Sequence, residues 1–200
     1  MNKNNLFCLS ISIILGIISI FLGQDVNGDS WNYHWYNAYS YLNNRLFYDL
    51  APADAHSYFN PYLDVLFYLC ITHLPAFWYM FLIGFLHGLI SFPILSICGF
   101  FLQNEKKFFK YLITIVCCFG SVFFVGQLGT SMHDNTTSLL NLFSFALLLK
   151  SNDKVNYKYL ICSGIIVGVS CGLKLTNAIY VITFIVLTFF LNRNCFNLKT

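Results

Sequence analysis

Two long runs without a charged side chain limit what this chain can fold into. Residues 6–23 carry no charge over 18 positions, and residues 76–103 carry none over 28. The hydrocarbon core of a bilayer is about 30 Å thick, and a helix crosses it with about 20 residues. Only a helix or a closed barrel satisfies all its backbone hydrogen bonds there. The two runs therefore predict an all-α fold, a polytopic transmembrane helical bundle.

The composition agrees with a membrane protein. Only 10% of the residues are charged and 58% are hydrophobic, whereas a soluble domain carries about 25% charged residues. The net charge of +3 is too small and too dispersed to indicate nucleic-acid binding, so we expect no nucleic-acid partner.

The first run follows Lys3 as a signal peptide would, but it is longer than a cleavable core and lacks a small-x-small site before Gln24. We expect a retained signal-anchor helix.

The positions of the charges predict six spans in a single transmembrane domain. The predicted spans are 6–23, 76–102, 111–128, 137–150, 159–175 and 178–192. With the N-terminus in the cytoplasm, nine of the eleven basic residues fall on the inner side, as the positive-inside rule requires. These nine are Lys3, Lys106, Lys107, Lys110, Lys150, Lys154, Lys158, Arg193 and Lys199. Arg45 and Lys174 fall outside, together with six of the eight acids.

The segment at 60–75, "NPYLDVLFYLCITHLP", is apolar but too short to span a membrane. Counting it as a span would also invert the sidedness of every later loop. We therefore predict a helix that lies in the outer interface, within a large first outer loop at 24–75. The alternative is an N-terminal extension of the next span, kinked at Pro75.

The first outer loop is rich in aromatic residues, with eleven of them between Gln24 and Tyr62. An aromatic belt at the lipid headgroups accounts for some of these. If 29–43 is helical, its i, i+4 spacing gives two faces. The first contains Asp29, Tyr33, Asn37 and Tyr41, flanked by Asn32, Tyr36 and Asn43; the second contains Trp31, Trp35, Ala38 and Leu42. Aromatic planes beside amides and a carboxylate suit a sugar, although a generic polar loop helix is the alternative.

The order of these features resembles the GT-C superfamily of membrane glycosyltransferases, and in particular its bacterial mannosyltransferase-like and arabinosyltransferase-like members. Asp29 heads "GDSWNYHWYNAYSYLNNR", and "YFNPYLDVLFYL" (58–69) stands where such proteins have a proline turn before an interfacial helix. Asp134 in "GTSMHDNTT" matches a second outer acid, and "CGLKLTNAIY" (171–180) matches a Thr-Lys or Lys-Thr element. The resemblance implies sugar transfer from a polyprenyl-phosphate carrier at the outer face of the bacterial inner (plasma) membrane. Full-length members usually carry more spans, so an N-terminal fragment is also implied.

The resemblance implies an inverting mechanism in which a carboxylate acts as general base toward the acceptor hydroxyl. Asp29 is the predicted base, and Asp25, four residues earlier, is the alternative. Lys174 is the predicted cation for the leaving phosphate, with snorkelling to the interface as its alternative. The predicted substrate-binding residues are Asn32, Tyr33, His34, Asn37, Arg45, Asn60, Asp134 and Lys174.

The expected partners are a lipid-linked sugar donor, a glycan, lipid or protein acceptor, and membrane lipids. The resemblance allows a divalent metal, but the acids of "DVNGD" lack D-x-D spacing and predict no tightly held ion.

His87, in mid-span, is predicted to be a buried neutral group. Two other functions stay open, namely a non-catalytic multi-pass assembly protein and a transporter-like protein. The near absence of charge within the spans disfavours the transporter.

Overall fold

The computed structural model describes residues 2–23, 25, 27–152 and 156–191, and every element in these residues is helical. The all-α prediction is therefore confirmed. Gln24, at the start of the predicted outer loop, and Asn192, at the end of the last predicted span, lie outside the described residues. The predicted cytoplasmic residues Lys154, Arg193 and Lys199 lie outside them as well.

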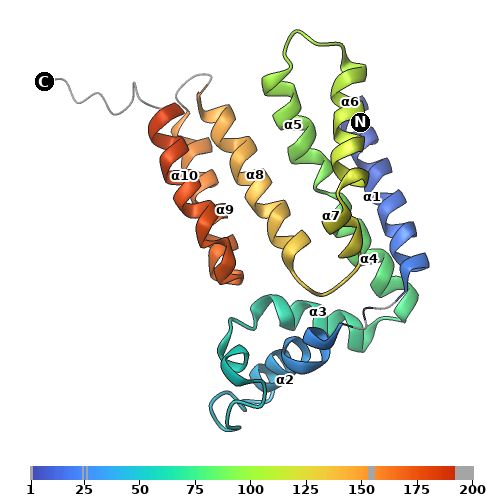
Figure 1. Cartoon of the computed structure of the whole chain (residues 1–200), viewed down its shortest axis with the longest axis vertical. Helices are drawn as coiled ribbons and strands as arrows, with labels where there is room; N and C mark the ends of the chain where they lie inside the picture. The colour runs from blue at the N-terminus through green and yellow to red at the C-terminus, as the bar shows by residue number, and fades with distance from the viewer. Residues whose placement is uncertain (1, 24, 26, 153–155, 192–200) are drawn as a thin grey trace, which may run out of the picture.

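The long helices run back and forth between two ends of the molecule (Figure 1). They are α1 (Lys3–Leu22), α4 (Ala76–Gly88), α5 (Ser91–Phe101), α6 (Lys107–Gly120), α8 (Asp134–Asn152), α9 (Tyr157–Leu173) and α10 (Ala178–Leu191). The start of α1, the α5–α6 turn, the end of α8 and the start of α9 lie at the upper end in the figure. Residues 27–75, 127–133 and 174–177 lie toward the other end. This alternation is the one that the predicted sidedness requires.

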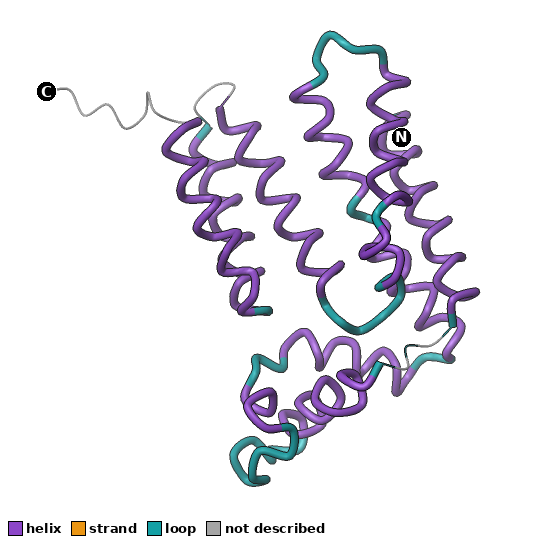
Figure 2. The backbone as a smooth tube through the Cα atoms, in the orientation of Figure 1, coloured by secondary structure: helices purple, strands orange, loops and turns teal. Residues whose placement is uncertain are grey.

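Short helices close the lower end of the bundle (Figure 2). They are the π-helical turn η1 (Ser30–His34), α2 (Trp35–Leu42), the 3₁₀ turn η2 (Asp54–Tyr58) and α3 (Tyr62–His73). α2 and α3 lie across the end of the bundle and not along it. Leu74 is extended (φ −103°, ψ 144°), as the residue before a proline prefers. α3 is therefore a separate helix, and the alternative of a kinked extension of α4 does not describe it.

Two described segments are long and apolar enough to cross a membrane, Lys3–Leu22 and Ala76–Phe101. They coincide with the predicted spans 6–23 and 76–102. Tyr157–Leu173 and Leu175–Leu191, which includes the 3₁₀ turn η3 (Leu175–Asn177), are apolar but shorter. The remaining four spans stay a prediction.

Local sequence explains two interruptions in the predicted spans. Pro93 has no N–H to give to the carbonyl of Leu89, so that carbonyl accepts from Phe92 at 3.0 Å, and α4 and α5 are separated by a tight turn. The predicted span 111–128 divides into α6 and α7 (Val122–Gly126) at Ser121, whose side chain accepts the Phe124 N–H at 3.3 Å. Serine is a favoured N-cap because its oxygen satisfies a free N–H at a helix start.

α1 and α4 pack closely through small residues. A Cβ built on Gly84 would lie 2.4 Å from Ser19 Cβ, and one built on Gly88 would lie 2.5 Å from Ser12 Cα. Ser19 Oγ also donates to the carbonyl of Met80 at 2.8 Å. Small residues that let two backbones approach are typical of helix pairs in membranes. This contact fixes α1 against the helix that follows the first large loop.

We expect Gly88→Ala to lower the unfolding free energy by about 1–3 kcal/mol, because the added methyl group meets the backbone of Ser12 and the helices must separate. Gly99→Ala in α5 is the matched control, since a Cβ there meets nothing within 4 Å. The thermal unfolding midpoint of each variant in detergent checks this. Equal midpoints for both variants would contradict the close α1–α4 contact.

Candidate functional site

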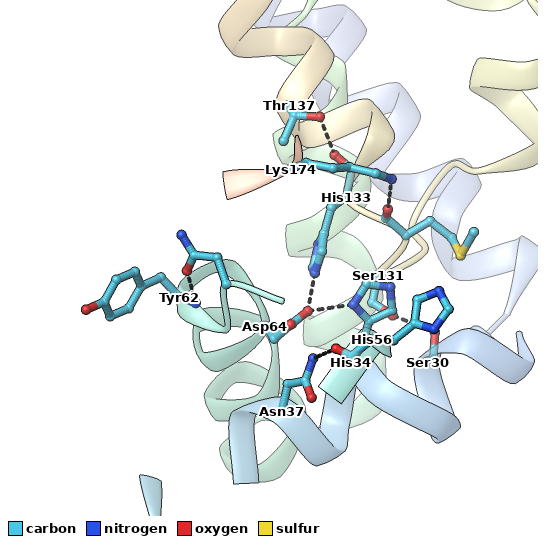
Figure 3. A network of polar contacts seen from close by, with 12 residues as sticks. Ser30, His34, Asn37, His56, Tyr62, Asp64, Ser131, His133, Thr137 and Lys174 are labelled. Carbon is cyan, nitrogen blue, oxygen red and sulfur yellow. Dashed lines mark hydrogen bonds and ion pairs between the residues drawn. The ribbon is translucent and has the colours of Figure 1, made fainter. Parts of the chain in front are cut away.

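A buried carboxylate lies at the lower end of the bundle between two histidines (Figure 3). Asp64 on α3 is 5% exposed, and its Oδ1 accepts a hydrogen bond from Nδ1 of His34 at 2.6 Å. Nε2 of His133 donates to the same oxygen. The two imidazole rings meet edge to face, with centroids 4.5 Å apart. The turn η1, the helix α3 and the loop before α8 thus meet at one oxygen atom. We call these three residues the His–Asp–His cluster.

Burial and hydrogen bonding set the charges of the His–Asp–His cluster. Burial raises the pKa of Asp64, but the hydrogen bonds from His133 and His34 outweigh it and hold the pKa below the usual value. Burial lowers the pKa of His133 by more than Asp64 raises it. The cluster therefore combines an ionised carboxylate with a neutral imidazole at His133. The outer nitrogens, Nε2 of His34 and Nδ1 of His133, are buried and find no hydrogen-bond partner among the described residues.

His87 of α4 holds the loop that carries His133. The backbone N–H of Gly129 donates to Nδ1 of His87 at 3.2 Å, so Nε2 carries the proton and bonds Thr136 Oγ1 at 3.2 Å. His87 is therefore buried and neutral, as predicted. His133 itself has φ +66°, a left-handed conformation that costs energy in a residue other than glycine. Such conformations gather at functional sites because the surrounding structure must maintain them.

Asp25 links the segment that follows α1 to the same region. Its carboxylate accepts from Ser30 Oγ at 2.7 Å, from Ser131 N and Oγ at 3.1 Å each, and from Asn27 N at 2.9 Å. Burial opposes ionisation, yet these hydrogen bonds lower the pKa of Asp25 below its usual value. A carboxylate with this many donors and a lowered pKa is a weak base.

Low pH should weaken the hydrogen bonds that Asp25 accepts, because it protonates the carboxylate. Because folding lowers the pKa of Asp25, the ionised carboxylate stabilises the fold above its unfolded-state pKa of about 3.9. That contribution is lost as the pH falls through the lower folded-state value. We expect the thermal midpoint of wild type to exceed that of Asp25→Asn at pH 7 and the difference to shrink at pH 3. The exposed Asp54→Asn is the control, and a difference that does not change with pH would contradict the assignment.

Asp29 lies beside the phenol of Tyr33. Burial, the charges of Asp29, Asp64 and Asp134, and a hydrogen bond with Asp29 together raise the pKa of Tyr33 to about 12. The Tyr33 hydroxyl is therefore protonated and lies close to three carboxylates from three segments. Asp29 is half-buried, and its backbone N–H bonds Asn27 Oδ1 at 2.9 Å.

Lys174 and Asp134 form an ion pair at the same end of the bundle. Lys174 follows α9 directly, and its Nζ lies 2.5 Å from Oδ1 of Asp134, the first residue of α8. The ammonium also donates to the carbonyl of Met132 at 2.9 Å. Gln127 Nε2 donates to the other carboxylate oxygen at 3.2 Å. The two predicted residues are thus brought together, in direct contact with the loop that carries His133.

The other predicted substrate-binding residues are more dispersed. Asn37 is fully buried and donates to the carbonyl of His56 at 2.8 Å, while Asn60 donates to the carbonyl of Gly172 at 2.7 Å. Arg45 pairs with Asp49 in the loop after α2, with nitrogen–oxygen distances of 2.8 and 2.5 Å. Asn32 is exposed on η1. Asn37 and Asn60 therefore join segments of the site, whereas Arg45 stabilises its own loop.

The helical faces predicted for 29–43 differ from those observed. Trp35 N–H donates to the carbonyl of Ser30, an i to i+5 bond that makes η1 a π-helical turn and changes the register. The buried side chains are Ser30, His34, Asn37, Ala38 and Ser40. Trp31, predicted on the hydrophobic face, is 60% exposed and packs on Trp35. The buried side of this segment therefore takes residues from both predicted faces, Asn37 from one and Ala38 from the other.

Sequence reasoning missed the central residue of the cluster. Asp64 is one of the six acids predicted to lie on the outer side, and neither Asp64 nor His133 is among the predicted site residues. A signal for Asp64 is present, because it is the one charged residue in the apolar "NPYLDVLFYLCITHLP". A charge in such a segment is unfavourable unless it is paired. His133 carries no comparable signal, because it lies in a polar loop where any histidine can be solvated.

Comparison with protein-family models, with curated proteins and with solved structures finds no match to this chain. The resemblance to the GT-C superfamily therefore stays a prediction from short motifs and their order. The chemistry available to the site comes from its own residues. These supply a half-buried carboxylate, a protonated phenol, a lysine and two imidazoles with unpartnered buried nitrogens.

Proposed function

We propose that this protein is a membrane glycosyltransferase of the GT-C type, which moves a sugar from a polyprenyl-phosphate donor to an acceptor at the outer membrane face. The observation that carries the proposal is the convergence of carboxylates, a phenol, imidazoles and a lysine at one end of the helical bundle. These groups come from four separate segments, namely 25–37, α3, the loop before α8 and Lys174. The acceptor is a glycan, a lipid or a protein.

The proposed membrane arrangement has six spans, with the N-terminus in the cytoplasm of a bacterial inner (plasma) membrane. It is supported by the alternating helix directions and by Lys106, Lys107 and Lys110, which lie at the same end as the N-terminus. At the opposite end, α2 and α3 lie across the bundle with exposed aromatic side chains such as Tyr39 and Tyr62. Aromatic rings of this kind favour the headgroup region of a membrane.

Asp29 is the proposed general base. The acceptor hydroxyl oxygen attacks the anomeric carbon, its proton passes to Asp29, and the bond between that carbon and the lipid-phosphate oxygen breaks. Asp25 is the less suitable base because several donors already occupy its carboxylate. Asn32, Tyr33 and His34 lie on the same segment as Asp29 and are proposed to contact the sugar or the acceptor. Asn37, Asn60 and Arg45, which bond the carbonyl of His56, the carbonyl of Gly172 and the carboxylate of Asp49, are proposed to hold the surrounding segments in place.

Lys174 is the proposed cation for the leaving phosphate. A fixed positive group stabilises charge that develops on a leaving oxygen, and it does so most strongly where water is excluded. Asp134 and the Met132 carbonyl position the ammonium in the absence of substrate. An incoming phosphate would then compete with Asp134 for Lys174.

An apolar cavity of about 360 Å³ lies between α8, α9 and α10. It is lined by side chains that include Leu142, Phe145, Leu148, Phe184 and Leu187. The helix α8 begins at Asp134 and lines this cavity from Ser138 onward. A lipid chain bound there would place its phosphate at the end of α8 where Lys174 lies, which supports a lipid-linked donor.

The reaction class is tested with membranes that contain the protein and a panel of radiolabelled polyprenyl-phosphate sugars. We expect label transfer from one of these donors, with inversion at the anomeric carbon of the product. Membranes with an empty vector are the control. If no donor supports transfer while the protein is present and folded, the non-catalytic assembly function takes precedence.

A further inference from the structure

We propose that the His–Asp–His cluster, His34, Asp64 and His133, binds one divalent transition-metal ion, with zinc as the expected metal. This inference does not depend on the proposed glycosyl transfer. The site differs from the one that the GT-C resemblance allows, in which the carboxylates of "DVNGD" would hold the ion.

The three residues form a ready-made set of metal ligands. One ligand atom from each lies within 4.8 Å of the other two, and all three residues are buried. Zinc takes histidine nitrogens and carboxylate oxygens at about 2.0–2.2 Å. The two imidazoles now form N–H···O hydrogen bonds to Asp64. When a metal binds, small rotations of the three side chains would replace these hydrogen bonds with nitrogen–metal and oxygen–metal bonds. The backbone segments already hold the ligands within reach of one ion.

The outer imidazole nitrogens would carry the ring protons when a metal binds. Nε2 of His34 and Nδ1 of His133 are buried, and they bond no group in the described part of the chain. A metal at the nitrogens that face Asp64 requires the proton of each ring on its outer nitrogen. Histidines that bind metals usually donate this N–H to a carboxylate, a carbonyl or water, and no bond in the described part of the chain fixes the opposite tautomer.

The electrostatics of the cluster also favour a cation. Asp64 is 5% exposed, and a buried carboxylate is unfavourable unless it is paired. Lys174 is occupied by Asp134 and by the carbonyl of Met132. The donors to Asp64 are two imidazoles, and a doubly charged ion would compensate the carboxylate more fully.

The ligand types indicate which metal is bound. Imidazole nitrogens favour zinc, iron, copper and nickel, whereas magnesium and calcium prefer oxygen ligands. Three protein ligands also leave a coordination position for water or substrate, as in catalytic zinc sites. Such an ion would join η1, α3 and the loop before α8, and would therefore order the entire outer end of the bundle.

The test uses the full-length protein, purified in detergent, stripped with a chelator and titrated with Co²⁺, a spectroscopic substitute for zinc. We expect visible d–d absorption that saturates at one Co²⁺ per chain, and displacement of Co²⁺ by added Zn²⁺. The thermal midpoint of the wild type should rise with Zn²⁺, because a ligand that binds only the folded state stabilises it.

The test variant is His133→Ala, which we expect to weaken Co²⁺ binding at least about 100-fold, since even partners beyond the ligands change metal affinity 10–100-fold. His73→Ala is the matched control, because His73 lies exposed at the end of α3 and outside the cluster. Asp64→Asn retains the side-chain shape and serves if His133→Ala does not fold. The proposal is overturned if folded wild type gives no d–d absorption and no thermal shift, which would leave a purely hydrogen-bonded cluster. Equal Co²⁺ binding by wild type and His133→Ala would also overturn it.

Discussion

Replacing Asp29 with asparagine is expected to lower the rate of sugar transfer by about 10²–10⁴-fold, the usual contribution of a general base. The amide has the same shape as the carboxylate but cannot accept the acceptor's proton. Tyr33 can still form a hydrogen bond to the amide, so the local structure should be retained. The measurement is the initial rate of label transfer from the active donor, normalised to the amount of folded protein.

Asp25→Asn separates the two candidate bases. Asp25 is held by Ser30, Ser131 and Asn27, and we therefore expect its loss to lower stability much more than the rate per folded molecule. The thermal midpoint of each variant is measured beside its rate. Equal rates for Asp29→Asn and wild type would exclude Asp29 as the base, and selective loss in Asp25→Asn would transfer that role to Asp25.

The sequence predicts the parts of the fold that depend on segment length and charge. Runs without charge predict the apolar helices Lys3–Leu22 and Ala76–Phe101, because nothing shorter than about 20 residues crosses hydrocarbon. The lysines at and just before the start of α6 predict that the α5–α6 turn shares an end with the start of α1, and the structure places it there. The proline at position 75 predicts a boundary between α3 and α4, because a residue before proline avoids the helical conformation.

The candidate site depends on contacts that a linear pattern does not contain. Asp64 meets His133 across 69 positions and His34 across 30. Their meeting requires α3 to lie across the bundle and the loop before α8 to be held by His87. The sequence also does not predict the helical register of residues 29–43. One π-helical turn shifts every later side chain, and no residue type in "SWNYH" identifies that turn.

Asp64 is expected to be the most sensitive position for the stability of the lower end of the bundle, where α2 and α3 lie. Asp64→Ala removes the acceptor of two buried hydrogen bonds and leaves His34 and His133 facing an empty space. Each buried imidazole N–H that loses its acceptor costs about 1–3 kcal/mol, so we expect the unfolding free energy to fall by about 2–6 kcal/mol. A chelator is present in this measurement, so that a bound metal does not contribute to the difference in unfolding free energy.

A graded pair of variants identifies the cause of this loss. Asp64→Asn keeps an oxygen that can accept from both imidazoles and loses only the charge, so we expect a cost of about 1–2 kcal/mol, nearer that of a neutral hydrogen bond. The exposed Glu105→Ala, at the opposite end of the molecule, is the control and should stay within about 0.5 kcal/mol of wild type. Equal thermal unfolding midpoints for wild type and Asp64→Ala would mean that apolar packing holds the lower end of the bundle together. In that case Phe67, Tyr79 and Ile83, which are buried between α3 and α4, would be the residues that fix α3 in place.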